Sequence, residues 1–297
     1  MNTFTEKWLN ISIYYSQEKW PQLFKRCLNP LLNELKQKDN NIIKSILLFC
    51  STDKGDNIQF FVQIASSYAD EHINFVMKGL KTYIAENPSV RKASPRPTQQ
   101  FFMDYPNNSI VDNISRPDLA EVWKNDYLDV QSFISELLAK EFEDDQIDEE
   151  AGFSFALYLV FVLFKVKLTG NKEEISTTIT CFLETKEVDY KEKYFFKDTE
   201  IKKITGLVQA VYQKNTSVID EIYLDVWKES STLLWIADWK ELLYKYFNNV
   251  SLINAYNIIL PLLQYHLNLH DINSKSIANW ITATITNHLN EGRTNSQ

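Results

Sequence analysis

The sequence predicts an α+β fold, in which a small N-terminal β-α-β-β-α lobe is followed by a mostly helical lobe. Two patterns predict it. Short runs rich in β-branched and aromatic residues lie before residue 66, and apolar residues recur at helical spacing through nearly all of the chain after residue 118. Glycine is also scarce, with 6 among 297 residues, so the many tight turns of an all-β barrel are not expected.

The first two elements follow from their residue periodicity. Residues 8–15 are aromatic and β-branched and alternate with period two, which predicts a strand. Residues 18–38 carry apolar side chains at every third or fourth position, which predicts an amphipathic helix. Pro21 suits the first turn of this helix, whereas Pro30 lies in its interior and should kink it.

A hairpin and a second helix are expected next. Residues 42–50 and 58–66 are apolar runs that predict two strands, and the polar segment 51–57 between them supplies the turn. A helix is expected from Asp70 to about Ala85. These elements complete the β-α-β-β-α lobe.

Prolines separate this lobe from the rest of the chain. Residues 86–117 contain five of the eight prolines, and two short strands are expected in this region, at 99–104 and 109–113. We predict an α+β lobe over about 1–115 and a helical lobe over about 116–297, or one integrated domain that contains both. A long helix is expected from Asp118 to the acidic run, followed by helices at 151–168, 171–184, 199–214, 216–229, 231–248, 252–268 and 275–290.

The charge balance argues against a nucleic-acid partner. The chain has 31 Lys and Arg residues against 39 Asp and Glu residues, a net charge of −8, and phosphate backbones repel such a chain. The acidic run at 141–150 is expected to be a solvated helix end, with contact to a basic partner as the alternative. Three widely spaced cysteines indicate reduced, buried thiols rather than a disulfide framework.

Neither a membrane span nor a cofactor is expected. The most apolar run, 151–164, is shorter than the roughly 20 residues that a spanning helix needs, so a buried core helix is predicted. Met1–Lys7 carries no apolar signal core, which favours a cytoplasmic protein. The sequence contains no nucleotide-binding, dinucleotide-binding or metal-ligating motif, so no cofactor and no metal are expected.

The order of elements and three short motifs resemble a known family. The chain reads Trp8-Leu-Asn-Ile-Ser-Ile-Tyr14 in its first strand, Pro30-Leu-Leu32 in the following helix, and Leu262-Leu-Gln-Tyr-His-Leu-Asn-Leu-His270 before its last helix. These features resemble the C-terminal glutamate-elimination domain of lantibiotic dehydratases, which also occurs as a stand-alone thiopeptide-type bacteriocin biosynthesis protein. The resemblance covers nearly the whole chain and implies a precursor peptide as the partner.

The resemblance also implies a reaction and candidate residues. The family eliminates glutamate from glutamylated Ser or Thr of a precursor peptide, which requires a base for the α-proton and cations for the departing glutamate. The corresponding hairpin reads Asn57-Ile-Gln-Phe-Phe-Val62 and lacks the family's arginines, which leaves Gln59 as its binding candidate. The family's C-terminal His and Asn fall on Gln264 and Asn268, and with a shift of two the His falls on His266.

Two versions of the function stay open on these residues. One is a lyase with divergent catalytic motifs, and the other is a catalytically silent partner that binds the peptide or a separate glutamylating dehydratase. A third hypothesis, outside the family, is an unrelated helical interaction protein whose resemblance is accidental. His266 and His270 are four residues apart, so both can face one side of a helix, and they are the catalytic candidates. The alternative is that they are surface or helix-end histidines.

A small basic cluster supplies further binding candidates. Arg91 and Arg96, with Lys92 between them, lie in the proline-rich loop. Loops often carry binding residues, so these arginines are candidates for a carboxylate or an acidic leader peptide. A solvated loop without a ligand is the alternative.

Overall fold

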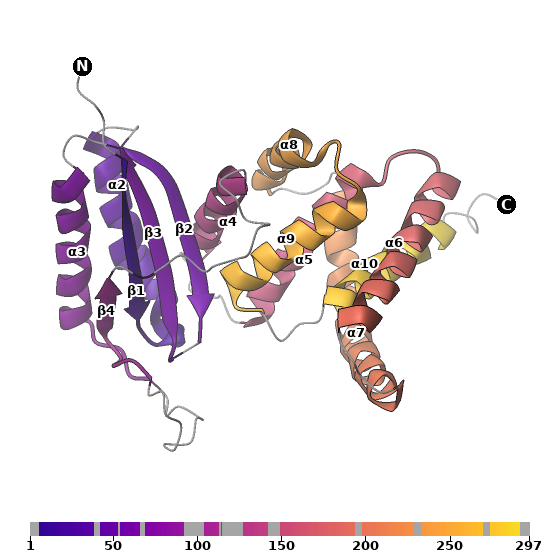
Figure 1. The fold of residues 1–297 in the computed structure, drawn as a ribbon, viewed down its shortest axis with the longest axis horizontal. Coiled ribbons are helices and arrows are strands. Elements are labelled where there is room, and N and C mark those ends of the chain that lie inside the picture. The colour runs from indigo at the N-terminus through magenta and orange to yellow at the C-terminus, as the bar shows by residue number, and fades with distance from the viewer. Residues whose placement is uncertain are drawn as a thin grey trace. The chain divides into compact units, whose positions relative to one another are not determined.

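The chain forms two compact units (Figure 1). The first comprises Met1–Glu149 and Tyr265–Asn268, and the second comprises Glu150–Gln264 and Leu269–Gln297. The short segment Tyr265–Asn268 therefore belongs with the N-terminal part of the chain. The computed structural model describes residues 6–38, 42–52, 54–65, 69–91, 104–112, 114, 127–141, 149–193, 198–228, 233–269 and 274–291.

A four-stranded antiparallel sheet forms the centre of the first unit. Its strands are β1 (Glu6–Tyr14), β2 (Ile43–Ser51), β3 (Asn57–Ala65) and β4 (Ser109–Asp112), in the order β2-β3-β1-β4 (Figure 1). The strands β2 and β3 form the expected hairpin. The two edge strands of the sheet are β2 and β4.

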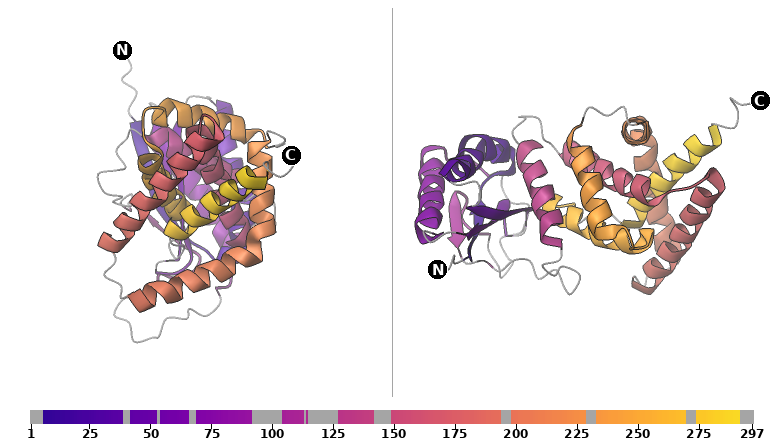
Figure 2. Two further views of the ribbon diagram at one scale, coloured as in Figure 1. Left: turned by 90° about the vertical axis from the view of Figure 1, so that its right-hand side faces the viewer. Right: turned by 90° about the horizontal axis from the view of Figure 1, so that it is seen from above.

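Helices cover one face of this sheet (Figure 2). They are α1 (Trp20–Leu23), α2 (Asn29–Lys38) and α3 (Ala69–Glu86), preceded by a 3₁₀ turn at Gln17–Lys19. Successive strand residues point to opposite faces, so Ile11 of β1 and its partner Phe60 of β3 share the helix-covered face, and both are fully buried. Burying an apolar side chain of this size contributes about 1.5–3 kcal/mol.

The helical segment is irregular next to Pro30. A π-helical turn, Phe24–Leu28, separates α1 from α2 directly before this proline. Pro30 has no N–H, so the carbonyl of Arg26, four residues earlier, lacks its usual helical partner. Interrupted bonding of this kind is where π-helical turns occur within helices.

Asn108 anchors the start of β4 on β1. Its φ is +63°, and its N–H donates to the carbonyl of Tyr14 at 2.7 Å, although Ser109 is the residue paired with Tyr14. Two residues opposite one, with the first in the left-handed region, form a G1-type β-bulge. The Asn108 carboxamide also makes two hydrogen bonds to the backbone of Ser89. It accepts from the Ser89 N–H at 2.7 Å and donates to the Ser89 carbonyl at 2.9 Å.

A further helix, α4 (Leu128–Glu141), packs beside β2 (Figures 1 and 2). It belongs to the first unit. The expected domain boundary between residues 115 and 116 lies outside the described residues and stays a prediction. The expected strand at 99–104 also lies outside them, except for Asp104.

The second unit is built from helices. Its buried helix is α5, in which the side chains from Phe161 to Phe164 are fully buried, as expected for the apolar run. Within the described ranges, no helix is both long and apolar enough to cross a membrane. The helices are α5 (Glu149–Lys167), α6 (Lys172–Lys193), α7 (Asp198–Trp227), α8 (Trp235–Phe247), α9 (Leu252–Leu267), whose last residues belong to the first unit, and α10 (Ser274–Glu291) (Figure 2).

Two expectations about this unit were wrong. The segments 199–214 and 216–229 form one helix, α7, because no Pro or Gly interrupts the backbone between them and the Thr216 hydroxyl donates back to the Tyr212 carbonyl at 2.9 Å. Cys181 is exposed on α6 rather than buried. The fold class itself is confirmed, since a β-α-β-β-α order opens the chain and helices follow.

Substitutions of Asn108 should separate two contributions to the free energy of unfolding, the positive φ of its backbone and the hydrogen bonds of its side chain to Ser89. Asn108→Gly keeps access to positive φ but removes the bonds to Ser89, and we expect it to lower the free energy of unfolding by about 1 kcal/mol. Asn108→Ala loses both features and should cost about 2 kcal/mol or more. Urea unfolding followed by circular dichroism measures both losses. Equal losses would mean that the positive φ carries no cost at this position.

Candidate functional site

The outer edge of β2 is closed by side chains rather than by another strand. The hydroxyls of Ser132 and Ser135, on α4, accept from the N–H groups of Ile46 and Leu48 at 3.1 and 2.9 Å. His266 Nδ1 donates to the carbonyl of Leu48 at 2.5 Å. An uncovered edge strand is a template for pairing with another chain. These three side chains both satisfy the edge and block it.

His266 is neutral and fully buried in this arrangement. Its ring stacks on Phe49, with ring centroids 4.4 Å apart. Because a carbonyl oxygen can only accept, the bond to Leu48 requires a proton on Nδ1. Burial lowers the pKa of His266 to about 4, so at neutral pH Nε2 carries no proton. This Nε2 atom is buried and has no hydrogen-bond partner among the described residues.

The geometry of His266 bears on its expected catalytic role. A neutral imidazole held through Nδ1–H has the form of a general base, with Nε2 as the proton acceptor. A pKa of about 4 makes that atom a weak base at neutral pH, and complete burial leaves a substrate no access to it in this conformation. What the ring does directly is close the β2 edge. Its catalytic role stays a prediction.

Asn268 and Gln264 lie at the end of α9. Asn268 has φ +56°, and the N–H of Leu269 bonds to the Gln264 carbonyl at 2.9 Å, which is the pattern of a Schellman helix end. The Asn268 carboxamide lies 3.5 Å from the hydroxyl oxygen of Thr52, the residue after β2. This helix end therefore places two residues of the C-terminal motif, His266 and Asn268, against β2 and the turn that follows it.

Gln59 lies close to the same group of side chains. On β3 it is paired with Phe49 of β2 and with Ser12 of β1, and it is half-buried. Phe49 forms a small apolar cluster with Leu47 and Phe61 on the sheet face that does not carry the main core. The structure thus brings Gln59 and His266 together as neighbours of one aromatic ring.

Arg91 is held by local contacts at the hairpin turn. Its guanidinium donates to the Tyr105 carbonyl at 3.1 Å and lies 3.8 Å from the Asp104 carboxylate. It also covers Gly55, where φ is +103° and an added Cβ would come within 2.5 Å of the guanidinium. Arg91 therefore fastens residues 104–105 to the β2–β3 turn. Its Nε and Nη2 atoms are buried and have no hydrogen-bond partner among the described residues, so these two donors are the ones that a peptide carboxylate could meet.

Other candidate residues are less informative. Arg96 and His270 lie outside the described residues, and their roles stay predictions. The sequence does not indicate Ser132 and Ser135, because their spacing places them on one helix face but carries no information on the strand they meet. Among the residues that the structure describes, no group of three or more His, Cys, Asp or Glu side chains could hold a metal ion.

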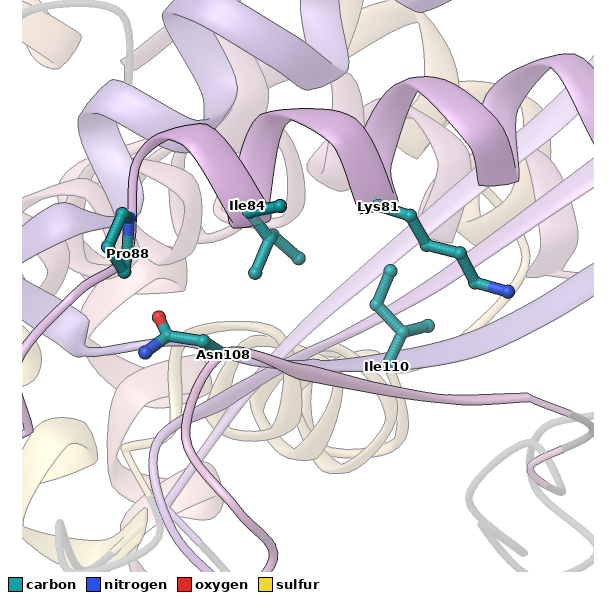
Figure 3. A pocket seen from close by; sticks show the side chains of 6 residues that line it. Lys81, Ile84, Pro88, Asn108 and Ile110 are labelled. Atoms are coloured by element: carbon teal, nitrogen blue, oxygen red, sulfur yellow. The ribbon is translucent and has the colours of Figure 1, made fainter.

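A cavity of about 290 Å³ opens between α3 and β4 (Figure 3). Ile84 of α3 and Ile110 of β4 point toward one another across it, and Lys81 extends from the helix beside them (Figure 3). The cavity is lined by Lys81, Ile84, Ala85, Pro88, Asn108 and Ile110. Its volume lies just below the usual range for ligand pockets, about 300–1,000 Å³. It therefore suits one part of a ligand rather than a large cofactor.

An N-terminal α+β unit followed by a helical unit has counterparts among solved structures. No family model matches the sequence, and no curated protein matches it either. The fold is similar to that of "Pyridine synthase, TbtD, from thiomuracin biosynthesis", with a TM-score of 0.66 and 11% identity over 96% of this chain and 99% of that one. It is also similar to TsrL, with a TM-score of 0.51 and 11% identity over 95% of each chain. The likeness establishes the fold, and at that level it supports the resemblance drawn from the sequence.

Acid should weaken the first unit through His266. Its pKa in the folded chain, about 4, lies below the ordinary value of 6.5, so the unfolded chain takes up the proton first as the pH falls. The stability contributed by the neutral ring is complete above about pH 6.5 and should be lost as the pH falls toward 4, by up to roughly 3 kcal/mol. Urea unfolding at a series of pH values measures this loss.

The matched control for this titration is His266→Asn. Its carboxamide can donate to the Leu48 carbonyl but does not titrate. The stability of the wild type relative to H266N should therefore fall between pH 6.5 and pH 4. A constant difference across that range would contradict the burial of a neutral imidazole.

Proposed function

We propose that this chain binds a precursor peptide in thiopeptide-type biosynthesis of ribosomally made natural products. The observation that carries the proposal is the fold shared with the pyridine synthase TbtD over 96% of the chain. The motifs at Trp8–Tyr14 and Leu262–His270 support it independently, because they point to the same kind of biosynthesis. A ribosomal precursor reaches such a protein as a flexible chain, so holding an extended segment is the first task.

In the enzymatic version, the protein modifies the peptide that it binds. The reaction is elimination of glutamate from a glutamylated Ser or Thr, or a related ring-forming step like that named for TbtD. Elimination needs a base, for which His266 Nε2 is the candidate, and a cation near the leaving carboxylate, for which Arg91 is the candidate. Peptide binding would then have to expose His266 and bring the leaving carboxylate to the buried Nε and Nη2 atoms of Arg91.

The second candidate function is a catalytically silent peptide-binding partner of a separate glutamylating dehydratase. A specific observation favours it. His266 is fully buried, and its Nδ1–H donates a hydrogen bond to the Leu48 carbonyl. Arg91 is likewise engaged by Asp104 and Tyr105. Both side chains therefore stabilise the first unit through contacts that do not involve a substrate.

Binding and chemistry can be measured on one peptide. We expect a fluorescently labelled thiopeptide-type precursor peptide to bind the protein saturably, as measured by fluorescence anisotropy. The glutamylated form of that peptide, incubated with the protein, should lose glutamate by mass spectrometry if the enzymatic version holds. Absence of peptide binding would refute the proposed function in both versions.

Substitution of the histidines distinguishes the two versions. If His266 is the base, His266→Asn should lower turnover by about 10²–10⁴-fold with peptide affinity unchanged. His270→Ala tests the second histidine in the same assay. His288→Ala is the matched control, since His288 lies on α10 beside Asp220 at 3.4 Å and has no proposed role. The silent version predicts peptide binding without turnover by the wild type or any variant.

A further inference from the structure

We propose that the outer edge of β4, with the cavity beside it, binds an extended acidic peptide segment as a fifth strand of the sheet. The inference rests on the proposed function and names the place where the first unit would hold its peptide. The two edges of the sheet differ, because β2 is closed by Ser132, Ser135 and His266. The other edge has a cavity alongside it instead.

The hydrogen bonds of β1 show which of its residues face β4. The N–H of Tyr15 donates to the carbonyl of Asp56, on the β3 side, at 3.1 Å. The carbonyl of Tyr14 accepts from Asn108, on the β4 side, at 2.7 Å. Backbone groups of successive strand residues point to opposite sides, so the even-numbered residues of β1 are those that bond to β4.

The same alternation assigns the free backbone groups of β4. Ser109 is paired with Tyr14 and Val111 with Ser12, so these two residues of β4 bond inward to β1. The N–H and carbonyl of Ile110, between them, then point to the outer edge. Within the described ranges, neither group has a partner there. An added strand would pair with them, which is the mode of recognition called β-augmentation.

The cavity gives such a strand side-chain specificity. Alternate side chains of an added strand enter the layer between the sheet and α3, where Ile84 and Ile110 face one another (Figure 3). One of them would be apolar and fill this space. The next side chain on the same face, two residues along the peptide, would approach Lys81.

The positive charge of α3 beside the cavity determines which second side chain of the peptide is favoured. Lys81 is the only charged residue among the six that line the cavity, and it is exposed. Lys78, three residues earlier on α3, is exposed on the same side of the helix. A carboxylate at this place gains a charge-assisted hydrogen bond, whereas an ammonium group is repelled. The expected ligand is therefore an extended segment with an apolar and an acidic residue two positions apart.

Two synthetic peptides test this specificity. The first repeats Val-Thr-Glu-Thr, so that Val and Glu share one face of the strand, and the second repeats Val-Thr-Lys-Thr. Each is labelled with fluorescein and titrated with the full chain. We expect the acidic peptide to bind at least about tenfold more tightly than the basic one. Equal affinity for the two peptides, or no binding of the acidic one, would overturn the proposal.

Paired variants locate the binding. Lys81→Glu should weaken binding of the acidic peptide by about tenfold, whereas Lys44→Glu, the same charge change at an exposed position of β2, should alter it by less than about twofold. Ile110→Pro removes the outward N–H and should weaken binding of the acidic peptide by about tenfold. Circular dichroism checks that each variant is folded. Equal effects of Lys81→Glu and Lys44→Glu, or unchanged binding by Ile110→Pro, would overturn the assignment to β4.

Hydrogen exchange gives a readout that does not depend on any variant. The outward amide of Ile110 should exchange rapidly in the free protein and more slowly with saturating acidic peptide, while β2 should be unaffected. Protection that appears elsewhere would overturn the β4 site. If the precursor peptide binds but Lys81→Glu and Ile110→Pro leave its affinity unchanged, the proposed function stands and this site does not.

Discussion

The bond from His266 Nδ1 to the carbonyl of Leu48 joins residues 218 positions apart and holds the segment Tyr265–Asn268 in the first unit. Three properties depend on it. It satisfies a carbonyl on the edge strand β2, it fixes the tautomer of a buried ring, and it removes one of two possible pairing edges from the sheet. Without the imidazole, the Leu48 carbonyl would remain buried beside Phe49 without a partner, at a cost comparable to other orphaned polar groups.

The two edges of the sheet are consequently not equivalent. Edge β2 is covered at Ile46 and Leu48 by side chains of α4 and by His266, which take the places that the backbone of an added strand would need there. Edge β4 is paired with β1 from Ser109 to Asp112, and at its start the Asn108 bulge and the bonds of Asn108 to Ser89 also fix the strand. A cavity then separates that strand from α3. A sheet with one closed edge offers a partner a single direction of approach, which limits register errors and self-association.

The periodicity of apolar residues predicted many of the strands and helices. Most of the features that it did not predict are contacts between residues far apart in the sequence. Strands β1, β2 and β3 and helix α3 were predicted within a residue or two, since period-two and helical spacing report which face is buried. The resemblance pointed to His266 and Asn268, and both do meet β2 or its turn. No spacing rule could indicate that Ser135 meets Leu48, 87 residues away, or that Arg91 would pair with Asp104. The fusion of two expected helices into α7 reflects the weak penalty of polar residues within a helix.

The separation of 218 residues between Leu48 and His266 also has a consequence during synthesis. At about 5–20 residues per second, a ribosome that has just made Leu48 needs on the order of ten to forty seconds more to reach the histidine that caps it. During that interval the nascent hairpin carries an unprotected carbonyl on an apolar strand. The β2 edge of a newly made sheet therefore stays incomplete until the ribosome has added a further 218 residues.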